Sequence, residues 1–237
     1  EAISDDEGYF VFALEPASPP ASAQPWQEVS VRWVDAPRDR SGPPVTALVL
    51  TPPPTATYGV ISDVDDTVLA SYITSVFKMA VEMLLKNVHG RATFPGVPQF
   101  YCALQGGPDG RANNPIFYVS LSPWNFYGLI EQFLALNGIP AGPVLLRDYG
   151  LQMLRTLRQP SPKYQLIQEV LDTYPHLPFI LLGDSGQHDP EIYAAIVRAN
   201  PGRVLAVYIR DVSAGRDAAR RAAVEALAAE VAAAGID

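Results

Sequence analysis

The segment Val60–Leu69, VISDVDDTVL, joins an apolar run to three carboxylates within four residues. The run predicts a buried β-strand, and Asp63, Asp65 and Asp66 follow where that strand ends. Carboxylates crowded at a buried strand terminus repel one another, which is costly unless a cation neutralises them. A hard divalent cation with oxygen ligands, Mg²⁺ above all, meets that need. The alternative is a turn whose Asp residues cap a helix, but a cap needs one carboxylate and not three.

Around this segment, short apolar runs alternate with amphipathic stretches from Tyr58 onward. Continuous apolar runs are typical of parallel strands that are covered on both faces. The expected strands are Gly59–Ser62, Ile116–Ser120, Val144–Arg147, Phe179–Gly183 and Val204–Arg210. The expected helices are Trp124–Asn137, Lys163–Thr173, Pro190–Ala199 and Ala214–Ala234. This order predicts an α/β fold with a doubly wound, mainly parallel sheet, whose ligands bind beyond the carboxyl ends of the strands.

Residues 1–57 have a different character, with many prolines and three short stretches of strand-like alternation. These stretches are Tyr9–Leu14, Val29–Val34 and Val45–Thr51. In the second, Val29, Val31 and Trp33 would share one face of a strand. We therefore expect a small N-terminal antiparallel β appendage over 1–57, followed by the main domain over 58–237.

Composition narrows the classes of function. The chain is 48% hydrophobic and 18% charged, which is typical of a globular protein, and its formal net charge is -8. An acidic chain disfavours sequence-independent binding of nucleic acid. Cys102 is the only cysteine, so neither an intrachain disulfide nor a cysteine-based zinc site is available. We expect no transmembrane segment, and, because no apolar signal segment follows Glu1, a cytoplasmic location.

Hydroxyl and amino groups follow at the ends of the next expected elements. Ser120 ends the second expected strand with a hydroxyl. Ser122, before Pro123, is typical of a helix N-cap with Pro at the first helical position. Lys163 stands at the start of a helix, where the helix dipole disfavours a cation, although an exposed surface lysine is the alternative.

A further pair of carboxylates follows the fourth expected strand. The string FILLGDSGQHD, residues 179–189, ends an apolar run in Gly183-Asp184, with Asp189 five residues later. Asp189 precedes Pro190 and could simply be the N-cap of the next helix. Asp184 ends a strand, as Asp63 does, and the two carboxylates are expected at the same edge of the sheet.

Taken in order, these motifs resemble those of the haloacid dehalogenase (HAD) phosphatases, with a HAD-like Rossmannoid fold. The resemblance implies that Asp63 is the nucleophile and Asp65 the general acid/base, while Asp66 falls at a variable position. Asp189 would orient a neighbouring ligand or metal-bound water. The implied metal ligands are Asp63, Asp65 and Asp184, and the implied phosphate-binding residues are Thr67, Ser120 and Lys163. A helical, cap-like insertion is expected over 70–115.

Longer strings resemble one family more closely. GVISDVDDTVL, FPGVPQFYCALQ, FYVSLSPWNFYGLIEQFL and LLGDSGQHDPEIY are similar to the catalytic domain of the fungal actin-patch phosphatidate phosphatase family and its bacterial relatives, over residues 58–211. The resemblance implies a Mg²⁺-dependent phosphomonoesterase of lipid metabolism that forms an aspartyl-phosphate and acts on phosphatidate at a membrane surface. The alternatives are a phosphatase of soluble phosphomonoesters or phosphoproteins, and a non-catalytic module that binds phosphate or lipid.

Overall fold

The structure is a computed structural model that describes residues 2–3, 10, 12, 24–33, 42–64, 96–147, 161–212, 217–233 and 235–236. The chain divides into two compact units, Glu1–Pro54 and Thr55–Asp237. In the first unit, strands β1 (Trp26–Val31) and β2 (Val45–Leu50) pair antiparallel, as the sequence predicts. The predicted bounds Val29–Val34 are wrong: the strand begins and ends three residues earlier, and Trp33, expected on the face of Val29 and Val31, lies beyond it and is 65% exposed. Val29 and Val31 are partly buried, whereas Ser30 between them is exposed. Of the expected strand Tyr9–Leu14, only Phe10 and Phe12 lie within the described residues.

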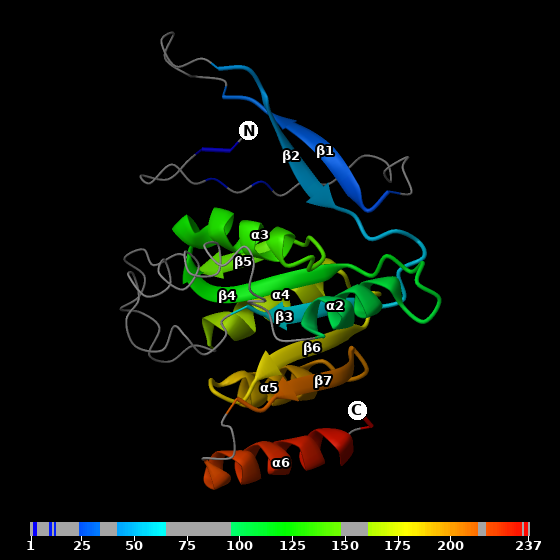
Figure 1. Cartoon of the computed structure of the whole chain (residues 1–237), viewed down its shortest axis with the longest axis vertical. Coiled ribbons are helices and arrows are strands. Elements are labelled where there is room, and N and C mark those ends of the chain that lie inside the picture. Colours follow the sequence, from blue (N-terminus) through cyan, green and yellow to red (C-terminus); the bar gives the residue numbers. More distant parts are fainter. Residues whose placement is uncertain are drawn as a thin grey trace. The chain divides into compact units, whose positions relative to one another are not determined.

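The second unit contains a five-stranded sheet in the order β5-β4-β3-β6-β7, in which every neighbouring pair is parallel (Figure 1). Its strands are β3 (Gly59–Asp63), β4 (Ile116–Pro123), β5 (Val144–Arg147), β6 (Phe179–Asp184) and β7 (Val204–Arg210). The chain moves outward from β3 to β5 and then returns to β6 on the other side of β3. The predicted doubly wound α/β sheet is thus confirmed, and its order reverses between β3 and β6.

Helices cover both faces of this sheet. They are α2 (Val97–Gly106), α3 (Tyr127–Leu136), α4 (Pro162–Thr173), α5 (Asp189–Ala199) and α6 (Ala218–Ala233). Side chains of α2 and α3 join a core cluster with Val60, Ile116 and Ile180. The alternate residues of the strands face the other way: the ring of Phe117 packs against Tyr174, just beyond α4, with ring centroids 5.2 Å apart. Helix α4 contacts β4, α5 contacts β6 and β7, and α6 packs on α5.

Helix α2 is tied to the strand that carries the Asp cluster. Its Leu104 is buried in the core, and the carbonyl of Leu104 accepts hydrogen bonds from Tyr58 Oη at 3.0 Å and Asn114 Nδ2 at 2.9 Å. Tyr101 and Ser62 share a 2.6 Å hydrogen bond between their hydroxyls. The last part of the predicted cap-like insertion, from residue 96 to 115, therefore packs on the sheet, while 70–95 lie outside the described residues.

Strand β4 continues three residues beyond its predicted end at Ser120. Its pairing with β5 shifts register between Val119 and Pro123, and Pro123 pairs with Arg147. The prediction that Ser122 caps a helix starting at Pro123 is wrong, because both residues lie in the strand and the short 3-10 helix η1 begins at Trp124. A Ser-Pro pair is typical of a helix start, but here the irregular pairing with β5 keeps the strand going.

Candidate active site

The two predicted carboxylates at strand ends come together at the edge where the strand order reverses. Asp63 ends β3 and Asp184 ends β6, and these strands pair through Ser62 and Leu182. Carboxylate oxygens of Asp63, Asp184 and Asp189 all lie within 4.8 Å of one another. The side chain of Asp63 is only 4% exposed, and Asp184 and Asp189 are buried. This is the place where an open α/β sheet binds its ligands.

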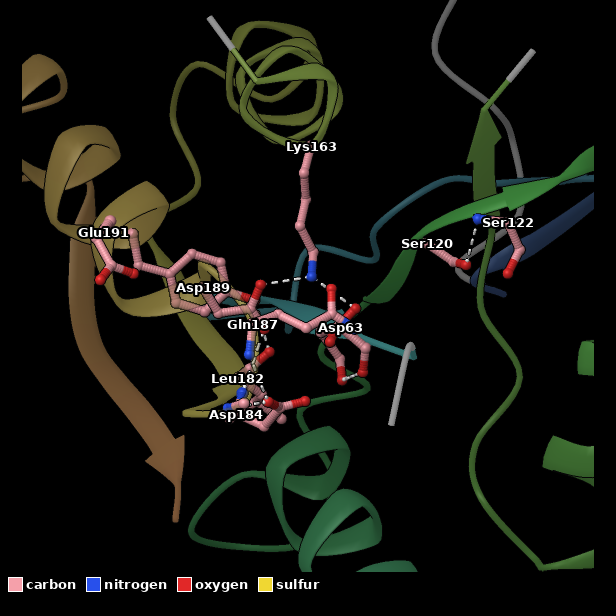
Figure 2. A network of polar contacts seen from close by, with 12 residues as sticks. Asp63, Ser120, Ser122, Lys163, Leu182, Asp184, Gln187, Asp189 and Glu191 are labelled. Atoms are coloured by element: carbon pink, nitrogen blue, oxygen red, sulfur yellow. Dashed lines mark hydrogen bonds and ion pairs between the residues drawn. The ribbon is translucent and has the colours of Figure 1, made fainter. Parts of the chain in front are cut away.

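Lys163 reaches this cluster from the first turn of α4. Its side chain is 1% exposed, and its Nζ lies 2.7 Å from Asp63 Oδ1 and 2.5 Å from Asp189 Oδ1 (Figure 2). Burial by itself lowers the pKa of Lys163, but the facing carboxylates of Asp63 and Asp189 outweigh burial and hold the pKa above its usual value. The ammonium is therefore charged at physiological pH, which explains why a cation is stable at a helix N-terminus.

Asp189 uses both of its carboxylate oxygens inside the protein. Oδ1 accepts from Lys163, and Oδ2 accepts the backbone N–H of Asp184 at 3.2 Å. The alternative reading, in which Asp189 is only the N-cap of its helix, is wrong: His188 holds the N-cap position and Asp189 is the first residue of α5. Asp189 is thus fixed between the ammonium and the end of β6.

Gly183 makes this close approach of α5 to β6 possible. A Cβ at residue 183 would lie 2.5 Å from Asp189 Oδ2 and 2.8 Å from Tyr193 Cε2. Tyr193 is fully buried and donates its hydroxyl hydrogen to the carbonyl of Leu182 at 2.7 Å. Glycine is required here for close packing, because a side chain would push α5 and its Asp189 away from the strand.

The loop after β6 holds the Asp184 side chain. Asp184 Oδ1 accepts the backbone N–H of Gly186 at 2.6 Å and that of Gln187 at 3.3 Å. Burial raises the pKa of Asp184 above its usual value, although the Gly186 N–H acts in the opposite direction. Among the described residues, no hydrogen bond or ion pair engages Asp184 Oδ2. The carboxylate of Asp184 belongs to the cluster with Asp63 and Asp189.

This arrangement fits a divalent cation. Three carboxylates and one ammonium make up the described cluster, which therefore carries two more negative than positive charges if all three carboxylates are ionised. Carboxylate oxygens are the ligands that Mg²⁺ prefers. Asp63 and Asp184 are the metal ligands that the motif resemblance implies, and Asp189 accepts hydrogen bonds at both of its carboxylate oxygens. The donor set thus has the charge and the chemistry to hold Mg²⁺.

The remaining predicted residues differ in what the structure says of them. Ser120 is fully buried on β4, one residue after Val119, which pairs with Asp63. The Ser120 Oγ accepts the backbone N–H of Ser122 at 2.9 Å (Figure 2). Asp65 and Thr67 lie outside the described residues. The structure therefore brings together Asp63, Lys163, Asp184 and Asp189, with Ser120 on the neighbouring strand.

Comparison with known proteins shows the family to which the chain belongs. The family described as "Phosphatidate phosphatase APP1, catalytic domain" matches residues 58–211, which is more than half of the chain. The chain belongs to this family. The matched segment runs from the start of β3 to just beyond β7, and it includes Asp63, Lys163, Asp184 and Asp189.

Two fungal proteins resemble part of this chain. The phosphatidate phosphatase APP1 of Saccharomyces cerevisiae is 34% identical over 154 residues, and an uncharacterized protein of Schizosaccharomyces pombe is 26% identical over 156 residues. These alignments cover 64% and 65% of this chain but only 25% of each fungal protein. The chain therefore spans about a quarter of the length of these relatives. Within the described residues, no helix is long and apolar enough to cross a membrane.

Several residues that shape the site cannot be recognised from sequence patterns. Tyr101 bonds Ser62 beside Asp63, and Tyr193 packs beneath Gly183. Tyr193 does stand in the quoted string GDSGQHDPEIY, but nothing marks it apart from its neighbours. Arg220, on α6, contacts the loop that holds Asp184. No motif could have revealed Arg220, because its partners are distant in sequence and most are backbone carbonyls.

Replacing Lys163 with Met should destabilise the protein. The substitution removes the cation from between two buried carboxylates, and breaking a buried pair in this way costs about 3–5 kcal/mol. The free energy of unfolding, measured in urea at neutral pH without divalent cations, should fall by that amount. In an Asp189→Asn background the same substitution should cost at least about 1 kcal/mol less, because one facing carboxylate is gone. Additive effects would contradict this picture of the buried cluster.

Proposed function

We propose that this chain is a HAD-type, Mg²⁺-dependent phosphomonoesterase that acts through an aspartyl-phosphate on Asp63, with phosphatidate as its substrate. The observation that carries the proposal is the position of Asp63 at the strand-order reversal, bridged to Asp189 by the buried ammonium of Lys163. Membership of a family described by a phosphatidate phosphatase supports both the reaction and the substrate.

In the first step, a carboxylate oxygen of Asp63 attacks the phosphorus of the monoester. The new bond joins Asp63 to phosphorus while the ester P–O bond breaks, and Asp65 donates a proton so that the leaving group departs as an alcohol. Asp63 must be ionised to attack, and the ammonium of Lys163 2.7 Å away favours its ionised form. The role of Asp65 rests on its place in the sequence motif.

In the second step, water attacks the phosphorus of the aspartyl-phosphate. Asp65, now ionised, takes the proton from that water, and the bond between Asp63 and phosphorus breaks to release inorganic phosphate. The two carboxylates thereby return to their starting protonation states. Splitting the hydrolysis in this way replaces one difficult displacement by two easier ones.

Charge compensation explains the other residues of the site. When bound, Mg²⁺ would neutralise charge on the transferring phosphoryl group, and the carboxylates of Asp63 and Asp184 and the backbone carbonyl of Asp65 would hold it. Lys163 balances Asp63 and Asp189 and would contact a phosphoryl oxygen as the substrate enters. The hydroxyls of Ser120 and Thr67 would donate to the remaining phosphoryl oxygens. Asp189 orients Lys163 and the end of β6 without itself binding the metal.

The Asp63→Asn variant tests the nucleophile. Because an amide is a poor nucleophile, we expect kcat to fall by at least about 10³-fold with phosphatidate and Mg²⁺. The exposed Asp172, which bonds Gln168 on α4, offers a matched control, and Asp172→Asn should retain wild-type activity. Circular dichroism would check that both variants fold. Substantial Mg²⁺-dependent turnover by Asp63→Asn would rule out Asp63 as the nucleophile.

Substrate preference can be measured by presenting phosphatidate in mixed micelles beside a panel of soluble esters. The panel includes glycerol 3-phosphate, which carries the same phosphomonoester without acyl chains, several sugar phosphates and a phosphoserine peptide. We expect kcat/KM to be at least about tenfold higher for phosphatidate, which corresponds to about 1.4 kcal/mol of binding to the lipid part. A higher value for a soluble ester would overturn the lipid substrate. No hydrolysis of any ester would instead favour a non-catalytic phosphate-binding module.

A further inference from the structure

Arg220 links the C-terminal helix to the loop that holds Asp184. It lies in the first turn of α6, beyond residues 58–211 that match the family. Its Nε donates to the carbonyl of Ser185 at 2.8 Å and its Nη2 to the carbonyl of Gln187 at 2.5 Å. The same guanidinium forms a bidentate ion pair with Glu191 of α5. One side chain therefore contacts the loop at Ser185 and at Gln187 and also contacts the helix that follows the loop.

The backbone N–H groups of the same loop point away from Arg220, toward the carboxylate of Asp184. Gly186 and Gln187 donate to Asp184 Oδ1, as described above. The carbonyl of Ser185 and the N–H of Gly186 belong to a single peptide unit. In a planar trans peptide these two groups point in opposite directions. When the guanidinium fixes the Ser185 carbonyl on one side, it also fixes the direction of the Gly186 N–H on the other.

The positive charge of Arg220 strengthens the hydrogen bond that the Gly186 N–H donates to Asp184. A cation that donates to a carbonyl polarises the whole peptide unit, so the N–H at its far end becomes a better donor. The chain of contacts runs from the guanidinium through one peptide group to Oδ1 of Asp184, whose carboxylate belongs to the cluster with Asp63 and Asp189. Arg220 thus acts on Asp184 without touching it.

We propose that Arg220 is a positioning residue of the metal site, which holds Asp184 in the orientation that binds Mg²⁺. This inference rests on the proposed function, since it takes Asp184 as a metal ligand. The proposal also makes α6 part of the structure that supports the active site. Arginine suits the role better than lysine, because its planar fork can donate to several acceptors at once in a fixed geometry.

A second ion pair between α5 and α6 provides a built-in comparison. Arg198 of α5 pairs with Glu230 of α6 at 2.6 Å, and both side chains are 53% exposed. This pair joins the same two helices but involves no carbonyl of the loop. If Arg220 only fastened α6 to α5, the loss of either arginine would have similar consequences. If Arg220 positions Asp184, only the loss of Arg220 should weaken metal binding.

The test compares Arg220→Met, Arg220→Lys and the control Arg198→Met by isothermal titration calorimetry with Mg²⁺. Hydrogen-bond partners of metal ligands contribute about 10–100-fold to metal affinity. We expect Arg220→Met to weaken Mg²⁺ binding by at least about 10-fold, Arg220→Lys to be intermediate, and Arg198→Met to match the wild type. An affinity of Arg220→Met within about threefold of Arg198→Met would overturn the proposal.

A metal-free measurement separates this proposal from the proposed function. The amide hydrogens of Gly186 and Gln187, followed by NMR exchange without divalent cations, should exchange faster in Arg220→Met than in Arg198→Met. Equal exchange rates would show that Arg220 does not order the loop and would overturn the proposal by themselves. If the wild type fails to bind Mg²⁺, the proposed function fails, and these exchange rates still decide whether Arg220 orders the donors to Asp184.

Discussion

The buried ammonium of Lys163, held between Asp63 and Asp189, is the interaction on which the rest of the site depends. It joins three elements that are far apart in the chain: the end of β3, the start of α4 and the start of α5. Without a cation at this point, the two carboxylates would repel each other in a place that water barely reaches. The cluster still carries more negative than positive charge, and this excess favours a divalent cation. In the proposed function, that cation would in turn attract the anionic substrate.

The backbone geometry at the end of β6 and in the loop after it fixes the positions of the carboxylates Asp184 and Asp189. The glycine at position 183 lets α5 approach β6 closely enough for Asp189 to accept the N–H of Asp184. In our proposal, Arg220 helps to hold Asp184 in place by donating to two carbonyls of the loop that follows β6. Because Arg220 lies beyond residues 58–211 that match the family, the proposed support of Asp184 comes from a helix that the family match does not include.

The parallel sheet and the positions of Asp63 and Asp184 could be predicted, because apolar runs that end in polar side chains are local patterns. The place of Lys163 in the site followed instead from the resemblance of the ordered motifs to those of the HAD phosphatases. The end of β4 could not, since the strand continues only through an irregular pairing with β5 that brings Pro123 opposite Arg147. Asp189 was ambiguous for a similar reason: a helix cap and an inward-facing carboxylate look alike before Pro190. Arg220 was missed altogether, as its acceptors are mostly backbone carbonyls, which carry no signature in the sequence.

The most direct test of the account is a crystal structure with Mg²⁺ and beryllofluoride, which imitates a phosphoryl group attached to a carboxylate. The account predicts beryllium bonded to a carboxylate oxygen of Asp63, Lys163 Nζ beside a fluoride, and the metal in contact with both Asp63 and Asp184. Beryllofluoride bonded to another side chain, or bound without any bond to Asp63, would contradict the claim that Asp63 accepts the phosphoryl group.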